Sequence, residues 1–215
     1  MLSFFFPAAS ENGDDDFSDT RASRVIMEEP NDKVRERTLD PEALRGTIKG
    51  LSTMSSLSLR KTDLNMDMLI KLADGMETAW AGTPGTLLSL DLAENPRLGP
   101  EGAVVVASLV ARHSIQSLDL GGIGCETRGA ISLAEAVTSK QCALHHLNLS
   151  QNGIRAEGAV AFARHTGQLT NLDLGSNPIG SVGAIAFAAL LKSSAVSAAA
   201  QDDTVRTSGL VLVTE

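Results

Sequence analysis

The sequence predicts an α/β solenoid, a horseshoe-shaped stack in which parallel strands line the concave face and helices cover the convex face. Three observations predict it. A pattern of the form L-x-x-L-x-L-x-x-N-x-L recurs from Met54 onward. Within each copy the apolar residues first occupy every second position, as in a half-buried strand, and then take helical spacing. Aromatic residues make up only 3% of the chain, which fits the aliphatic core of stacked units.

Residues 1–39 are predicted to form a disordered acidic leader. Acidic residues crowd between Glu11 and Asp19, and no apolar periodicity runs through the segment. A segment of this composition cannot bury enough apolar surface to offset its conformational entropy. An acidic docking tail is the alternative interpretation. The apolar run at the start of the chain is broken at Pro7 and has no basic flank, so we do not expect a signal peptide.

The repeat domain is predicted to span 40–192 and to begin with a capping helix. Asp40 is a favourable N-cap, and Pro41 suits the first helical turn because an N–H there would have no partner. Apolar residues then follow at helical spacing, and Gly50 is a candidate end. We expect this helix to cap the N-terminal end of the stacked core.

Five copies of the repeat can be aligned, and each is expected to supply one strand, one turn and one helix. They begin at Met54, Leu87, Ile115, Leu144 and Leu169. The asparagine of the pattern is expected to bond backbone groups in the turn where the strand leaves the sheet. Its position is occupied by Thr62, Asn95, Ile123, Asn152 and Asn177. A Gly-Ala pair opens the helix in the last four copies, where a larger residue would prevent close packing.

Residues 193–215 are predicted to form an irregular tail. The segment up to Gly209 is rich in Ser, Ala and Asp and shows no repeat. The triplet Leu210-Val211-Leu212 then restores the strand alternation, which predicts a degenerate sixth strand, with a frayed end as the alternative. No convincing cap covers this end, so we expect the chain to self-associate through it. A related hypothesis is that the chain is one piece of a longer receptor or scaffold.

The repeats also resemble a known family. The segment Leu169–Ala184 has the form L-x-x-L-D-L-G-x-N-P-I-G-x-x-G-A, and it looks like the ribonuclease-inhibitor-like subclass of leucine-rich repeats, as does 144–159. This subclass includes ribonuclease inhibitors, the repeat domains of NOD-like receptors and the Ran GTPase-activating protein. The resemblance extends over about 54–191 and implies a solenoid that binds a partner protein. The chain departs from the pattern at Ile123 and Cys125.

The candidate partner-binding residues lie on the concave face of the predicted sheet. The middle residue of each L-x-L strand points away from the core, and stacked strands place equivalent positions about 4.8 Å apart. Asp91 and Asp119 should therefore adjoin in one ladder, with Asp173 two steps further on. Such an acidic stripe would dock a basic partner surface, while the alternative is that these aspartates only keep the strands soluble. The residues predicted to bind the partner are Ser58, Arg60, Asp91, Asp119, His146, Asn148 and Asp173.

Composition and motifs argue against several other functions. The net charge of −8 disfavours nucleic acid and anionic membranes, which select clustered Lys and Arg. No stretch approaches the ~20 apolar residues of a membrane span. The sequence has no nucleophile elbow, no phosphate loop and no plausible dinucleotide fingerprint. We therefore predict a non-enzymatic interaction module or scaffold that needs no cofactor.

The histidines and cysteines are predicted to be structural. His145 and His146 have no neighbours able to complete a metal site. Cys125 replaces an apolar core residue and is expected to be a buried, inert thiol, whereas Cys142 precedes a strand and is expected to be more exposed. Two thiols without a CxxC spacing indicate a reducing compartment, so we predict that the protein is cytoplasmic or nuclear.

The alternative function is that of a GTPase-activating protein for a small Ran-like GTPase, which the family resemblance implies. That activity uses polar residues at the edges of repeat turns to order the active site of a partner. The nearest candidates are Arg60, Arg97 and Arg155. None of them maps onto a catalytic position of the family, so the interaction module is preferred.

Overall fold

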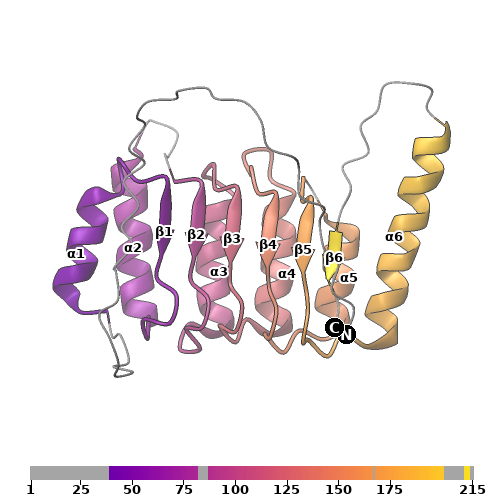
Figure 1. Cartoon of the computed structure of the whole chain (residues 1–215), viewed down its shortest axis with the longest axis horizontal. Helices are drawn as coiled ribbons and strands as arrows, with labels where there is room; N and C mark the ends of the chain where they lie inside the picture. Colours follow the sequence, from indigo (N-terminus) through magenta and orange to yellow (C-terminus); the bar gives the residue numbers. More distant parts are fainter. Residues whose placement is uncertain (1–38, 82–86, 167, 201–210, 214–215) are drawn as a thin grey trace, which may run out of the picture.

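The computed structural model describes residues 39–81, 87–166, 168–200 and 211–213, and it shows a stack of strand–helix units (Figure 1). Six parallel strands form one sheet in chain order. They are β1 (Ser56–Ser58), β2 (Ser89–Asp91), β3 (Ser117–Asp119), β4 (His146–Asn148), β5 (Asn171–Asp173) and β6 (Val211–Val213). The helices are α1 (Pro41–Gly50), α2 (Met66–Ala79), α3 (Gly99–Val110), α4 (Glu126–Val137), α5 (Ala156–Arg164) and α6 (Gly180–Ala200). The predicted α/β solenoid is therefore confirmed.

The helices pack against one face of the sheet, with α1 and α6 at the two ends of the array (Figure 1). The core lies between these two layers. Leu118 in β3 and Leu120 just after it are 1% and 0% exposed, and the other repeats repeat this burial. Burying one such leucine contributes about 1.5–3 kcal/mol, so the period-2 leucines supply the main stabilisation of the stack.

The first helix begins where the sequence predicts it to begin. The Asp40 side chain accepts a hydrogen bond from the Ala43 N–H at 2.7 Å, which satisfies one of the free donors at the helix start. Leu44 and Leu51 are buried against the first repeat. The Leu39 N–H donates to the Thr62 carbonyl at 2.9 Å, so the chain before the helix is tied to the turn after β1. The predicted acidic leader, apart from Leu39, lies outside the described residues.

Asn95 joins two repeats through its buried amide. Its Oδ1 accepts from the N–H groups of Thr62 (3.1 Å) and Leu64 (2.9 Å) in the preceding repeat. Its Nδ2 lies within 2.8 Å of the Leu59 carbonyl oxygen of that repeat and within 2.9 Å of the Leu92 carbonyl oxygen of its own turn. The predicted turn role is therefore confirmed, and the structure adds a bond across the repeat boundary.

We call this arrangement the asparagine bracket, and it recurs at Asn152 and Asn177. Asn152 accepts from the N–H groups of Ile123 and Cys125 in the third repeat, and its Nδ2 donates to the Leu120 carbonyl. Asn177 makes the same contacts with the fourth repeat. The third repeat carries Ile123 at this position, and an aliphatic side chain can form no bracket to the second repeat.

The C-terminal part differs from the predicted irregular tail. Helix α6 continues past the predicted boundary at 192 to Ala200. The residues that follow Lys192 include four alanines and neither glycine nor proline, so nothing stops the helix there. A sixth strand is present and β6 pairs in parallel with β5, but Leu212 stands opposite Leu172, two residues later than the predicted Leu210–Leu212 triplet places the register. No helix in the described part of the chain is long and apolar enough to cross a membrane.

Two glycines offer a matched test of the helix packing. A Cβ at Gly129 would lie 2.6 Å from the Ala103 Cβ and 2.8 Å from the Cys125 Sγ, whereas a Cβ at Gly46 in α1 would meet nothing within 4 Å. We expect Gly129→Ala to lower the free energy of unfolding by about 1–3 kcal/mol through overpacking. Gly46→Ala should raise it by about 0.5–1 kcal/mol, because alanine restricts the unfolded chain. Urea unfolding curves measure both, and a Gly129→Ala variant as stable as the original would contradict the close packing.

Candidate functional site

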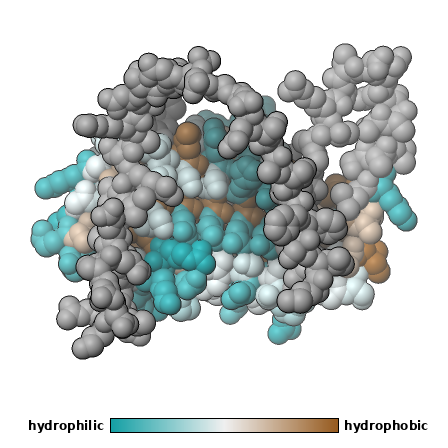
Figure 2. Space-filling model, viewed as in Figure 1, coloured by the Kyte–Doolittle hydropathy of each residue, from teal (hydrophilic) through white to brown (hydrophobic). Residues whose placement is uncertain are grey.

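The face of the sheet that carries no helices presents two rows of polar side chains. We call it the open sheet face. Its strands are in register, and the leucine between the two rows points into the core. The first row is Ser56, Ser89, Ser117, His146 and Asn171, and the second is Ser58, Asp91, Asp119, Asn148 and Asp173. Hydrophilic side chains gather over the strands in the visible part of this face (Figure 2).

The second row has a structural task of its own. One side-chain oxygen of Asp91, Asp119, Asn148 and Asp173 accepts the backbone N–H of the residue two positions later, at 2.8–3.0 Å. Aspartate and asparagine serve equally well in this bond, because both offer a carbonyl-type oxygen at the same place. The recurrence of these residues is therefore explained by the turn after each strand and requires no partner.

Arg60 lies across the N-terminal half of the open sheet face and neutralises part of the predicted acidic stripe. Its guanidinium donates to Glu94 at 2.7 Å and reaches Asp119, two strands away from β1, at 3.3 Å. The hydrogen bond to Glu94 raises the pKa of Arg60 above its ordinary value. The remaining oxygen of Asp91 accepts from the Ser58 hydroxyl at 2.9 Å. The result is a network of side chains that bond one another and need no partner for these contacts. Its members are Ser58, Arg60, Asp91 and Asp119.

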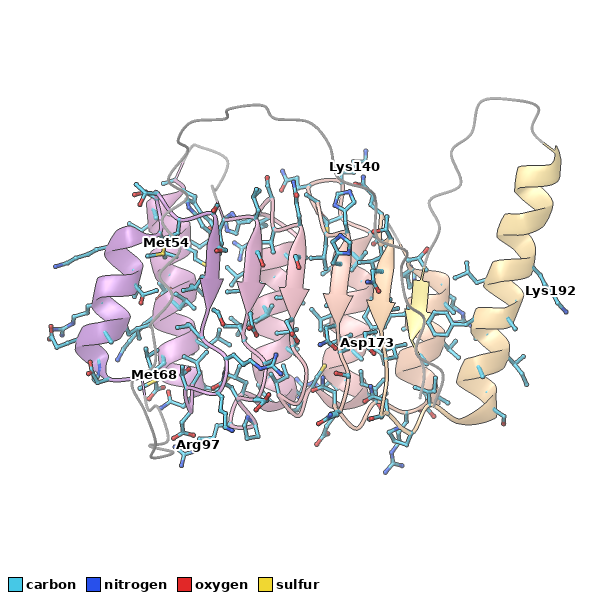
Figure 3. The ribbon with its side chains drawn as sticks, in the orientation of Figure 1. Met54, Met68, Arg97, Lys140, Asp173 and Lys192 are labelled. Atoms are coloured by element: carbon cyan, nitrogen blue, oxygen red, sulfur yellow. The ribbon has the colours of Figure 1, made fainter. Side chains whose placement is uncertain are left out.

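The C-terminal half of the face carries polar side chains whose hydrogen-bonding capacity is only partly used by the described residues. His146 and Asn171 are exposed and adjoin one another on neighbouring strands. Asn148 and Asp173 adjoin in the second row, and Asp173 lies on β5 (Figure 3). Within the described part of the chain, neither the imidazole of His146 nor the second carboxylate oxygen of Asp173 has a bonding partner. We call His146, Asn148, Asn171 and Asp173 the β4–β5 cluster.

The sequence predicted three members of this cluster and missed Asn171. Asn171 stands at the first position of its strand triplet, as His146 does in β4, and the same x-L-x pattern could have identified it. The predicted ladder order is confirmed, since Asp91 stands opposite Asp119 and Asp173 follows two strands beyond Asp119. The prediction that this stripe binds a basic partner stays a prediction.

The helix side carries a shallow hollow where α5 is short. The hollow is bounded by α4, α5 and the start of α6, and its floor includes Ile131 and Val160. Glu135, Glu157 and Arg164 stand around it, so charges of both signs surround an apolar floor. Among the described residues, none of the buried side-chain atoms that lack a hydrogen-bond partner lies at this hollow.

The two cysteines are both buried, and they are unsuited to nucleophilic chemistry. Cys125 is 0% exposed, and burial raises the pKa of its thiol to about 12. Cys142 is 5% exposed, and burial raises its pKa as well. Cys142 is more exposed than Cys125, as predicted, but only slightly, because the loop before β4 folds its side chain into the core. In the part of the chain that the structure describes, no group of three or more His, Cys, Asp or Glu could hold a metal ion.

Two of the three arginines named for GTPase activation are engaged in ion pairs. Arg60 binds Glu94 and Asp119, as described above. Arg97 pairs with Asp63 at 2.9 Å near the turn after the second strand (Figure 3). Arg155 stands just before α5, and among the described residues its guanidinium has no acidic partner within ion-pair distance.

Comparison with known proteins agrees with this geometry. A family model for the leucine-rich repeat matches residues 86–107, 140–163 and 169–188, which are the second, fourth and fifth copies. The fold is that of a leucine-rich-repeat solenoid. The first copy and the third copy, which carry Thr62 and Ile123 in place of asparagine, lie outside the matched segments.

The leucine-rich-repeat array is also similar to a solved structure, that of leiomodin-1 actin-binding site 2, with a TM-score of 0.50. The two sequences are 15% identical, and the match covers 74% of this chain and 93% of the other. At this identity the likeness is one of fold. A comparison with curated protein sequences gives no match.

Proposed function

We propose that this leucine-rich-repeat protein is a non-enzymatic interaction module or scaffold, of the ribonuclease-inhibitor-like subclass, that binds a partner protein on its open sheet face. The observation that supports this most directly is the β4–β5 cluster. Ser58, Arg60, Asp91 and Asp119 bond one another, whereas four adjoining side chains on β4 and β5 keep bonding capacity that the described residues do not use. Leucine-rich-repeat domains generally act through protein–protein interaction, and stacked strands offer the extended surface for it.

The charges on the open sheet face define the kind of partner group that fits. Arg60 offsets one of the three negative charges of Asp91, Glu94 and Asp119, and these groups already bond one another, whereas the second carboxylate oxygen of Asp173 has no bonding partner among the described residues. A cationic side chain of the partner would meet Asp173, and amide or carbonyl groups would pair with the neighbouring His146 and Asn171. The proposed contact is therefore a basic, hydrogen-bonding patch that centres on β4 and β5.

The test compares partner capture by two matched triple variants. The sheet-face variant carries His146→Ala, Asn171→Ala and Asp173→Asn; the last change keeps the oxygen that accepts the Gly175 N–H, as Asn148 does in its own strand. Each variant is immobilised, crosslinked to proteins from its native cell, and scored by quantitative mass spectrometry. We expect the sheet-face variant to lose specific partners about tenfold or more.

The control variant changes the helix side in the same number of positions, with Glu135→Ala, Glu157→Ala and Arg164→Ala. It should capture the same partners as the original chain. Partners that are retained by the sheet-face variant and lost by the control would place the interface on the helix side and overturn the proposal. Circular dichroism of both variants confirms that each is folded.

The same experiment also bears on two more specific functions, actin binding and GTPase activation. The similar leiomodin-1 structure is that of an actin-binding site, so actin is scored among the captured proteins, although the likeness itself concerns the fold. The comparisons give no support to a GTPase-activating function, and the ion pairs of Arg60 and Arg97 do not favour it. We further propose the cytoplasm or nucleus as the compartment, which fits two free, buried thiols.

A further inference from the structure

Helix α6 exposes positions that the preceding helices bury. The alanine of each Gly-Ala pair is 0% exposed in α3, α4 and α5, whereas Ala184 in α6 is exposed. One turn later, Ala107, Ala134 and Ala163 are buried, whereas Ala188 is exposed. In the earlier helices the following helix covers these alanines, since a Cβ on Gly183 would lie 2.9 Å from Ala159. The outer side of α6 therefore repeats a stacking surface used within the array.

This outer side is also unusually apolar for an exposed helix. Val182 is 60% exposed and Ile185 is 67% exposed. The positions equivalent to Val182 in α3, α4 and α5 carry charged residues, Glu101, Arg128 and Glu157. From Gly180 to Leu191 the helix has no charged residue, and Lys192 points away from the array (Figure 3). We call Val182, Ala184, Ile185, Ala188 and Ala189 the α6 face.

A free strand edge lies at the same end of the array. Strand β6 pairs with β5 on one side, and within the described part of the chain it has no neighbour on the other. An edge strand presents unpaired N–H and C=O groups that can pair with a further strand. An apolar helix face and a strand edge at the same end call for a partner that supplies both a helix and a strand.

We propose that a second copy of the chain binds at this end and forms a two-fold dimer. A two-fold axis perpendicular to the sheet would bring two β6 edges together as antiparallel strands and would keep the helices of both copies on the same side. The same axis would pack the two α6 faces against each other. The contact is isologous, so an uncharged face meets an identical uncharged face. Small residues on both helices permit a close approach of their axes.

The charges on α1, at the opposite end of the array, disfavour a head-to-tail contact between α6 of one copy and α1 of the next. Helix α1 carries Glu42 and Arg45, whose side chains are 81% and 71% exposed and are paired with each other at 2.9 Å. Placing the α6 face on this surface would bury charged groups against an apolar helix, which is costly. The α6 face therefore finds its best match in another α6 face. The open sheet faces of both copies stay free on one side of the dimer, so the dimer would be bivalent for the proposed partner.

The test measures the mass of the full chain across micromolar concentrations by light scattering and sedimentation velocity. We expect a species of twice the 22.5 kDa chain mass that forms with increasing concentration. Ile185→Glu should abolish it, because the substitution places a charge at the centre of the contact. Ile70→Glu is the matched control, since Ile70 is an exposed isoleucine on α2, 45% exposed and far from α6 in the stack, and it should leave the dimer intact.

Both variants change exposed positions, so they should fold, and their melting curves verify this. A wild-type chain that stays monomeric at the highest concentration would overturn the proposal. So would a dimer that survives Ile185→Glu, a dimer that Ile70→Glu disrupts equally, or a mass beyond two chains. Since the measurement uses the isolated chain alone, its failure leaves the proposed function on the open sheet face unaffected.

Discussion

Replacing Leu120 with aspartate is expected to unfold the repeat array. Leu120 is 0% exposed at the end of the third strand, and its neighbours are the leucines of adjoining repeats. The substitution removes about 1.5–3 kcal/mol of apolar burial and places a carboxylate where no cation can pair with it. Because small domains are stable by only about 5–15 kcal/mol, the combined loss should exceed what the array can sustain. Far-ultraviolet circular dichroism should show the loss of helix at room temperature.

Ser117→Asp is the matched control, because it adds the same charge to the same strand on the open sheet face. Its free energy of unfolding should change by less than about 0.5 kcal/mol. Trp80, the single tryptophan, is buried in the core and reports unfolding of the first repeats by fluorescence. If the two variants melted at similar temperatures, the placement of Leu120 in the core would be wrong.

Removing the amide of Asn95 should produce the second-largest effect. Asn95→Ala removes the acceptor of the Thr62 and Leu64 N–H groups and the donor to three carbonyl oxygens, of which Leu92 loses its bond, while Leu59 keeps the Thr62 hydroxyl and Ala93 keeps the Lys61 N–H. Each unsatisfied buried group costs about 1–3 kcal/mol, and partial relaxation reduces the sum, so we expect a loss of about 3–5 kcal/mol. Chemical denaturation with urea measures the difference in free energy of unfolding.

Two further variants show whether the bracket causes this loss. Asn171→Ala makes the same change at an exposed residue of the open sheet face and should be nearly neutral. Asn95→Asp keeps the acceptor oxygen but replaces the amide donor, which faces the carbonyl oxygens, with a second acceptor oxygen. It should therefore lower the free energy of unfolding at least as much as Asn95→Ala does. An Asn95→Asp variant as stable as the original chain would contradict the donor bonds to Leu59 and Leu92.

The fold could be predicted from the sequence because the repeat is short in sequence and periodic. Alternating leucines specify each strand, and the repeat length specifies which strands adjoin, so the ladder of Asp91, Asp119 and Asp173 follows from alignment alone. The asparagine position was also recognised. Its bond to the preceding repeat was not, because that contact joins residues about 30 positions apart and no short pattern encodes it.

The features that sequence reasoning missed depend on side-chain reach and on packing. The length of Arg60 lets it cross two strands and pair with Asp119 as well as Glu94, which reduces the negative charge of the acidic stripe. The burial of Cys142 depends on the path of a loop, and composition alone does not determine that path. The extension of α6 to Ala200 reflects an alanine-rich segment whose serines had suggested irregular structure.

Ile123 has a consequence for how the array comes apart. Asparagine brackets tie the first repeat to the second, and they tie the third, fourth and fifth repeats together, but Ile123 leaves the junction of the second and third repeats without one. In a linear stack, cooperativity is set by the coupling between neighbours. This junction therefore depends on the pairing of β2 with β3 and on the packing of α4 against α3, where Gly129 approaches Ala103, and it lacks the side-chain bonds that the other junctions add. The Arg60–Asp119 ion pair adds one further link across this junction on the open sheet face, and salt can screen that link.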